Sequence, residues 1–271
     1  MSYIFNSFQL IIGIFSVLFI QCSGLAIRSS TPIPCSSFNA SALRVVTFDL
    51  FGALMLTESS MTGSIRSLLP SLSSTNVTNF VNSWLKAYVS YFGQSFSPSL
   101  THQPFQWVIN SSLVQILASL GLSDQVPQNS TTFKALMSSW GNLKPRPNVV
   151  DVLTVLSSKY QLGLLSNGDH ETLQSALRVF PPSVNVSLIL SSDYPANCFK
   201  TCSNMYAQAL NAVQGDLTRV LHVAGSTYDA NGARAFGIFS GAIDPGQKSV
   251  ADPQPCFIFN DIKDLLLLLN V

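Results

Sequence analysis

The spacing of apolar residues divides the chain into two kinds of segment. Between residues 57 and 142, apolar side chains recur at the spacing of amphipathic helices. Two sets follow the i, i+3, i+4, i+7 pattern: Val81, Trp84, Leu85 and Tyr88, then Leu113, Ile116, Leu117 and Leu120. We therefore predict a helical block over 57–142, closed by the segment Pro145-Arg146-Pro147.

Outside that block, short apolar or β-branched runs alternate with segments of helical spacing. The predicted strands are 44–48, 161–165, 186–190, 219–223, a short one near 237–240, and 256–259. The predicted helices are 149–156, 172–179, 204–213, 231–236 and 261–269. This alternation predicts an α/β fold with a parallel sheet covered by helices on both faces.

The order of these segments predicts the domain organisation. Residues 27–42 form a Ser/Pro-rich lead-in, and a core domain comprises 43–56 and 143–271. The helical block 57–142 is inserted after the first strand, where we expect it to form a cap over the core.

The first 26 residues contain no charged side chain. Their apolar run at 10–20 is shorter than the roughly 20 residues of a spanning helix and fits the hydrophobic region of a secretory signal. Gly24-Leu25-Ala26 provides small residues for a cleavage site. We expect a signal peptide at 1–26 and a secreted protein with no stable membrane insertion after cleavage, with a retained signal anchor as the alternative.

Composition narrows the class of partner. Charged residues make up 10% of the 271 residues and the formal net charge is +1, whereas a typical soluble domain is roughly 25% charged. This balance argues against a nucleic-acid partner. The sequence does not indicate an oligomeric state. Five Asn-X-Ser/Thr sequons predict N-glycans that supply hydration in place of the missing charges: Asn39, Asn76, Asn110, Asn129 and Asn185.

Polar residues follow four of the predicted strands. Asp49 ends the first strand, Ser166 and Asn167 end the second, Lys200 lies after the third, and Asp229 after the fourth. Because ligands of open parallel sheets bind beyond the carboxyl ends of the strands, these residues are the candidate site.

Four motifs in this order resemble the haloacid dehalogenase (HAD) superfamily, and more narrowly its type II, (S)-2-haloacid dehalogenase branch. They are FDLFGAL at 48–54, LLSNGD at 164–169, Phe199-Lys200 with Tyr206, and YDANGARAFG at 228–237. The resemblance covers about 43–262 and implies a HAD-like sheet with a helical cap after the first strand.

The resemblance implies a catalytic role for three charged residues. Asp49 is the expected nucleophile, whose carboxylate forms a covalent ester that water then opens. Lys200 keeps the carboxylates ionised, because a nearby cation lowers a carboxyl pKa. Asp229 orients Lys200 and helps to place the water.

The resemblance also implies a set of substrate-binding residues. Ser166, Asn167 and the backbone N–H groups after them are expected to bind the substrate carboxylate. Phe51 and Tyr206 are further pocket residues. The family's cap arginine, which accepts the departing halide, follows a tryptophan; here Leu85 follows Trp84, and Lys86 is the candidate halide acceptor.

Two substitutions favour carbon–halide over phosphorus chemistry. HAD phosphatases carry a second Asp two residues after the nucleophile, where this chain has Phe51, and an additional metal-binding acid in the last motif, where it has Ala224. We therefore expect no metal and no cofactor. No acid–base or ligand partner is evident for the three histidines, which we interpret as structural: His102, His170 and His222.

The predicted function is thus a secreted hydrolase that acts on small 2-halo carboxylates. A hydrolase of other specificity, in particular a phosphatase, is one alternative. A catalytically weakened binding protein is another, because Ala53, Leu85 and Ala224 replace polar residues of the family's site.

Four cysteines follow the signal, and no histidine lies near them at zinc-ligand spacing, so we expect disulfides. Cys35 precedes the first strand and Cys256 begins the last, which places both at the amino edge of a parallel sheet. Cys198 and Cys202 follow a strand and belong to the opposite edge. We predict the pairs Cys35–Cys256 and Cys198–Cys202, the second closing a loop around Lys200.

We expect enzymatic removal of N-glycans to lower the solubility of the secreted protein, because the chain has few charges of its own. Gel mobility and centrifugation before and after glycosidase treatment check this. Unchanged mobility would contradict the predicted glycans, and unchanged solubility would contradict their role.

Overall fold

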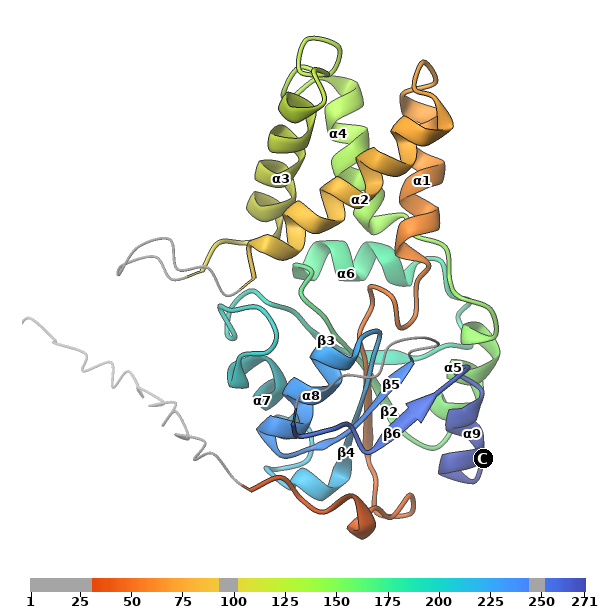
Figure 1. Ribbon diagram of the computed structural model, residues 1–271. Coiled ribbons are helices and arrows are strands. Elements are labelled where there is room, and N and C mark those ends of the chain that lie inside the picture. Colours follow the sequence, from red (N-terminus) through yellow and green to blue (C-terminus); the bar gives the residue numbers. More distant parts are fainter. Residues whose placement is uncertain (1–30, 93–101, 244–251) are drawn as a thin grey trace, which may run out of the picture.

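Six parallel strands form the centre of the protein, in the order β3-β2-β1-β4-β5-β6 (Figure 1). The computed structural model describes residues 31–92, 102–243 and 252–271, so the predicted signal peptide lies outside the described residues. The strands are β1 Val45–Phe48, β2 Gln161–Leu165, β3 Val186–Leu190, β4 Val220–Ala224, β5 Phe239–Ile243 and β6 Phe257–Phe259. The predicted α/β fold with a parallel sheet is confirmed.

Helices cover both faces of this sheet, as expected. Those of the core are α5 Val149–Ser157, α6 His170–Leu177, α7 Ser203–Asn211, α8 Thr227–Phe236 and α9 Asp264–Leu269. Helices α7 and α8 pack on one face, and α5 and α9 on the other (Figure 1). In β1 all four residues are buried. Val45 belongs to the apolar cluster on the side of α7 and α8, while the next residue, Val46, belongs to the cluster on the side of α5 and α9. This alternation is why a central strand is apolar throughout.

Two predicted helix starts were wrong, each because of a local cap. Helix α8 begins at Thr227 rather than 231, since the Ser226 hydroxyl accepts the backbone N–H of Asp229 at 3.3 Å. Asp229 therefore lies in the first turn of the helix. The last helix begins at Asp264 rather than 261, because the Asp264 carboxylate accepts backbone N–H groups of Asn260 and Asp261 and holds that segment in a turn.

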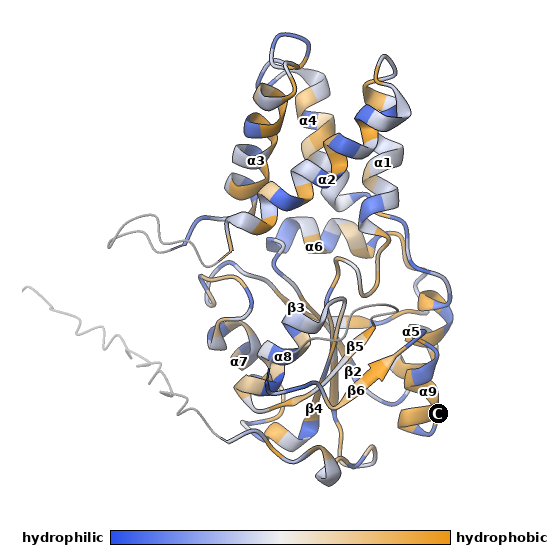
Figure 2. Ribbon diagram, in the orientation of Figure 1, coloured by the Kyte–Doolittle hydropathy of each residue, from blue (hydrophilic) through white to orange (hydrophobic). Residues whose placement is uncertain are grey.

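A separate layer of helices stands over the carboxyl ends of the strands (Figure 1). It contains α1 Thr57–Leu68, α2 Ser74–Ser90, α3 Phe105–Ser119 and α4 Thr131–Ser138. Figure 2 shows apolar and polar residues interleaved along each of these helices. Within the described ranges, no helix of the protein is long and apolar enough to cross a membrane.

An aromatic cluster joins this helical layer to the core. The ring of buried Trp140 lies 4.6–5.7 Å from the rings of Phe51, Trp84, Tyr88 and Phe105. Phe51 follows β1, whereas the other rings belong to the helical layer and its exit. Such ring pairs add to the stabilisation from burial alone, so the cluster fixes the layer over the loop that follows β1.

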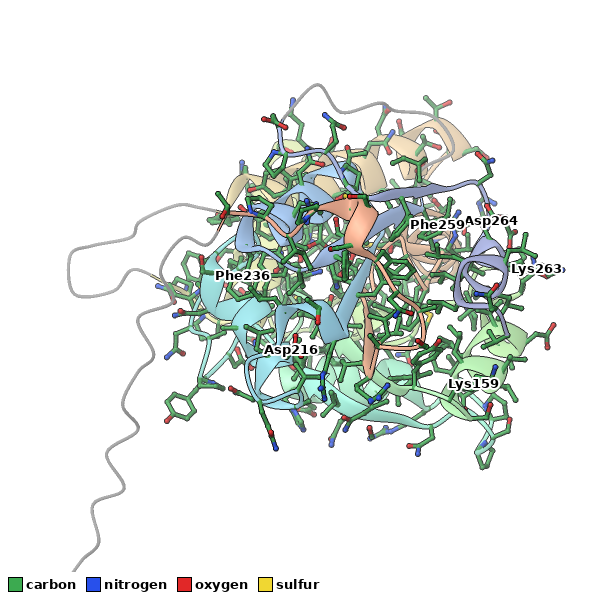
Figure 3. The ribbon with its side chains drawn as sticks, turned by 90° about the horizontal axis from the view of Figure 1, so that it is seen from below. Lys159, Asp216, Phe236, Phe259, Lys263 and Asp264 are labelled. Carbon is green, nitrogen blue, oxygen red and sulfur yellow. A yellow bond between two sulfur atoms is a disulfide. The ribbon has the colours of Figure 1, made fainter. Side chains whose placement is uncertain are left out.

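The lead-in is tied to the far edge of the sheet. The Phe38 ring packs at 5.1 Å on Phe239 and at 4.8 Å on Phe257. The disulfide Cys35–Cys256 closes this contact, and the second predicted pair, Cys198–Cys202, is also present. Figure 3 views this end of the protein from below, where Lys159 and Asp216 precede β2 and β4, away from the carboxyl ends of the strands.

We expect the C35S/C256S double variant to lose about 2–5 kcal/mol of unfolding free energy, because that bridge joins residues 221 positions apart. Denaturant unfolding of oxidised protein measures this. The matched control is C198A/C202A, which opens a bridge between residues only four positions apart and should cost less. An equal or larger loss in the control would contradict the prediction.

Candidate active site

The ammonium of Lys200 lies between two carboxylates. Its Nζ is 2.9 Å from Oδ1 of Asp49 and 2.6 Å from Oδ2 of Asp229. Asp49 follows β1, Lys200 lies between β3 and α7, and Asp229 lies in the first turn of α8. The side chains of Lys200 and Asp229 are only 4% and 6% exposed, and that of Asp49 is 14% exposed. The structure therefore brings together the three residues predicted as catalytic.

The sheet and a tight loop hold Asp49 in place. Its backbone N–H donates to Val223 at 2.9 Å, which continues the β1–β4 ladder, and the Ser166 hydroxyl donates to Oδ1 at 2.9 Å. The loop after Asp49 passes so close to the end of β4 that a Cβ at Gly225 would lie 2.5 Å from the backbone nitrogen of Ala53. Glycine is required there by this close approach.

Lys200 is held from its own backbone. Its N–H donates to Oδ1 of Asn167 at 2.8 Å, so the loop after β2 positions the loop after β3. The Cys198–Cys202 disulfide closes the short segment that contains Lys200. Asn167 thus supports the catalytic lysine in addition to bordering the site.

Asp229 receives hydrogen bonds on both oxygens. The Tyr206 hydroxyl lies 2.9 Å from Oδ1, and Nε2 of His222 lies 3.0 Å from Oδ2. The other ring nitrogen of His222, Nδ1, lies 3.0 Å from the Thr47 hydroxyl. Because an ionised carboxylate can only accept, Nε2 carries the proton toward Asp229.

His222 is a site residue that the sequence analysis missed. It was interpreted as structural because no acid–base or ligand partner for it is evident in the sequence. Because side chains alternate between the two faces of β4, the position of His222 in the strand indicates that its side chain lies on the side of α8. Nothing in the sequence shows that the first turn of α8 returns over that strand.

The electrostatics of the three groups are coupled. Burial raises the pKa of the Asp49 carboxyl, and the Lys200 charge only partly offsets this. For Asp229, burial acts in the same direction, but Lys200 and His222 together hold its pKa well below the ordinary value. For Lys200, burial alone lowers the pKa, but the two carboxylates raise it above the ordinary lysine value. Both shifts favour the charged forms, the ammonium of Lys200 and the carboxylate of Asp229.

A cavity of about 920 Å³ opens beside these groups, between the helical layer and the carboxyl ends of the strands. Asp49, Lys200 and Asp229 border it, as do the predicted site residues Phe51 and Asn167. Tyr88 of α2 also borders it, and burial raises the Tyr88 pKa well above its usual value. Tyr88 was predicted only as part of an apolar helix face.

Three predicted substrate-binding residues are placed elsewhere. Ser166 and Tyr206 are fully buried and do not border the cavity, because their hydroxyls turn to Asp49 and Asp229. Lys86 is exposed on α2 and also lies outside the cavity lining. Successive helix residues point about 100° apart, and on α2 it is Leu85 that faces the cavity. Lys86 is therefore not placed to accept a halide.

Two arginines border the cavity instead, Arg66 at the end of α1 and Arg146 in the segment that leaves the helical layer. Neither belongs to a motif, and the Pro-Arg-Pro sequence gave only the end of the helical block. The predicted chemistry needs cations near a substrate anion. The two arginines are therefore candidate site residues that the sequence analysis did not identify.

The donor set does not fit a divalent metal ion. Among the described residues, no three His, Cys, Asp or Glu side chains converge as metal ligands. The two carboxylates at the site are each bonded to the Lys200 ammonium. The ammonium therefore occupies the position that a divalent metal ion would take between them.

We expect Lys200→Met to lower the unfolding free energy at neutral pH by about 3–5 kcal/mol, because it leaves buried carboxylates without their counter-ion. The lowered Asp229 pKa means that this pairing stabilises the fold above the unfolded carboxyl pKa and is lost as pH falls. The difference from the wild type should therefore shrink on acidification. Denaturant unfolding at several pH values measures it, with the exposed Lys263→Met as the matched control. A pH-independent difference would contradict the prediction.

Comparison with known proteins agrees with this geometry. A family model described as haloacid dehalogenase-like hydrolase matches residues 43–237. The chain is 25% identical over 199 residues to (S)-2-haloacid dehalogenase 4A of Burkholderia cepacia, covering 72% of this chain and 80% of that protein.

Solved structures show the same fold. The L-2-haloacid dehalogenase RSc1362 superposes with a TM-score of 0.74 at 26% identity, covering 84% of this chain and 99% of the other. The L-2-haloacid dehalogenase of Xanthobacter autotrophicus superposes with a TM-score of 0.71 at 20% identity, covering 84% and 98%. With its sheet, helical layer and ordered strand-end residues, this chain belongs to the haloacid dehalogenase-like hydrolase family.

Proposed function

We propose that this protein hydrolyses small (S)-2-halo carboxylates through an ester on Asp49. The observation that carries the proposal is the unequal treatment of the two Asp49 oxygens. Oδ1 accepts from Ser166 and from Lys200, each at 2.9 Å, whereas among the described residues no donor bonds Oδ2. A carboxylate with one oxygen held and the other free at a cavity is oriented for nucleophilic attack.

In the first step, Oδ2 of Asp49 attacks the halogen-bearing carbon from the side opposite the halogen. A carbon–oxygen bond forms, the carbon–halogen bond breaks, and halide leaves with the bonding electrons. The raised pKa of Asp49 makes its carboxylate a better nucleophile than that of an ordinary aspartate, while the Lys200 charge favours the ionised form.

In the second step, water attacks the ester carbonyl carbon and releases the 2-hydroxy acid. The hydroxyl oxygen of the product comes from Asp49, and the water oxygen remains in the carboxylate. Each turnover delivers one proton and one halide to solvent. Lys200 stabilises the oxyanion that forms on Oδ1, and Asp229, whose low pKa makes it a weak base, holds Lys200 in position.

The comparisons support the choice of substrate. The curated relative and the two structures described above are named as dehalogenases of 2-halo acids. We further propose that the enzyme acts outside the cytosol, which the two disulfides and the exposure of Asn39, Asn76, Asn129 and Asn185 support.

We expect the purified protein to release halide from (S)-2-chloropropionate, and Asp49→Asn to lower that rate at least about a thousandfold, because an amide is not a nucleophile. Halide titration measures the rate, and the exposed Asp124→Asn is the matched control. Single turnover in ¹⁸O-water should place the label in Asp49 and not in the product.

Three results would contradict the proposal. Label appearing first in the product excludes the Asp49 ester. Magnesium-dependent hydrolysis of p-nitrophenyl phosphate without halide release indicates a phosphatase. Turnover of neither substrate indicates a binding protein on an inactive site.

A further inference from the structure

We propose that the cavity binds an amphiphilic carboxylic acid, with its acid group on Arg146 and an apolar body larger than a methyl group along the aromatic wall. This inference rests on the proposed function and names the substrate class of the same site. Neither the size of the ligand nor a role for Arg146 follows from the motifs in the sequence.

The cavity is far larger than the smallest substrate of the proposed reaction. Its volume of about 920 Å³ lies near the upper end of the 300–1,000 Å³ that is typical of pockets for drug-sized ligands. A three-carbon halo acid fills a small part of such a space. A larger organic group is needed to displace the remaining water.

The wall chemistry selects an apolar group for that space. The cavity lining includes the apolar residues Phe51, Leu85, Phe92 and Trp140. The rings of Phe51, Trp140, Tyr88 and Phe92 contact one another in that order and form the aromatic wall of the cavity. At its rim, Val89 of α2 and Tyr228 of α8 are 54% and 60% exposed. An alkyl or aryl body that covers these two side chains removes their apolar surface from water, which favours its binding.

The charges around the cavity determine where the acid group of a ligand can bind. Asp49, Lys200 and Asp229 together carry one net negative charge, which repels an anionic ligand. Two of the three N–H groups of the Lys200 ammonium already bond those carboxylates, which more than balance its charge. A carboxylate ligand therefore needs a different cation that borders the same cavity.

Arg146 meets this need with a fixed geometry. Its Nη1 donates to the carbonyl of Gly52 at 2.9 Å and its backbone N–H donates to Leu54 at 2.8 Å, so it is attached to the loop that begins at Asp49. Among the described residues, no carboxylate lies within ion-pair distance of Arg146. The remaining guanidinium donors suit a carboxylate, which arginine binds through two parallel hydrogen bonds.

Arg66 is the weaker candidate for the same role. It borders the cavity but is exposed at the end of α1, where water screens its charge. The half-buried Arg146 beside the Asp49 loop is the residue that the geometry selects.

The inference is tested by binding of acids that cannot react. Isothermal titration calorimetry compares propionate, 4-phenylbutanoate and the neutral 4-phenylbutan-1-ol on the full protein. We expect 4-phenylbutanoate to bind at least about a hundredfold more tightly than propionate, from burial of its apolar body. We expect the alcohol to bind at least about tenfold more weakly than the acid, since it lacks the charged pair.

Variants assign the acid group to Arg146. Arg146→Gln should remove the preference for acid over alcohol, and Arg146→Lys should keep part of it; Lys263→Gln is the matched control. Thermal unfolding of each variant checks that the fold is intact. If Arg146→Gln does not fold, the comparison of Arg146→Lys with the wild type decides, because a bidentate pair is weakened by lysine.

The outcomes separate this inference from the proposed function. Equal affinity for the short and long acids, or an unchanged acid preference in both Arg146 variants, overturns the inference, even if 2-chloropropionate releases halide. Tight, Arg146-dependent binding of the long acid without halide release from any 2-halo acid supports the inference and contradicts the proposed function.

Discussion

The contact on which the rest of the site depends is the Lys200 ammonium between the carboxylates of Asp49 and Asp229. Three charges in a nearly water-free position are stable only when each is bonded. The surroundings supply those bonds: Ser166 to Asp49, and Tyr206 and His222 to Asp229. These six residues come from the ends of β1 and β2, from the loop before α7, and from α7, β4 and α8. All six elements therefore have to meet at one point, and this requirement explains the close packing of the loops.

The same contact divides labour between the two carboxylates. Asp229 is surrounded by donors and is held as a fixed anion, so it serves to position Lys200. Asp49 has one bonded oxygen and one free oxygen, and its pKa is raised by burial. Hydrogen bonding and burial thus distinguish Asp229, a counter-ion of Lys200, from Asp49, the proposed nucleophile.

The helical layer forms one side of the cavity that Asp49 borders. The aromatic cluster around Trp140 fixes the layer over the loop after β1, and the space left beneath it is wide and apolar. Arg146 lies where the chain returns from this layer to the core. In the proposed function, the inserted helices and their exit therefore select substrate size and charge, while residues at the ends of the strands carry out the chemistry.

The sequence by itself determined the parallel sheet, the inserted helices, both disulfide pairings and the meeting of Asp49, Lys200 and Asp229. It could do so because strand alternation and the shared edge of parallel strands are properties of local pattern and chain order. Only the tertiary structure decided that His222 and Tyr206 bond Asp229, that Lys86 points away while Leu85 faces the cavity, and that Arg146 borders it. Those facts depend on the rotation of each helix about its axis and on where distant segments cross, and local spacing does not specify either.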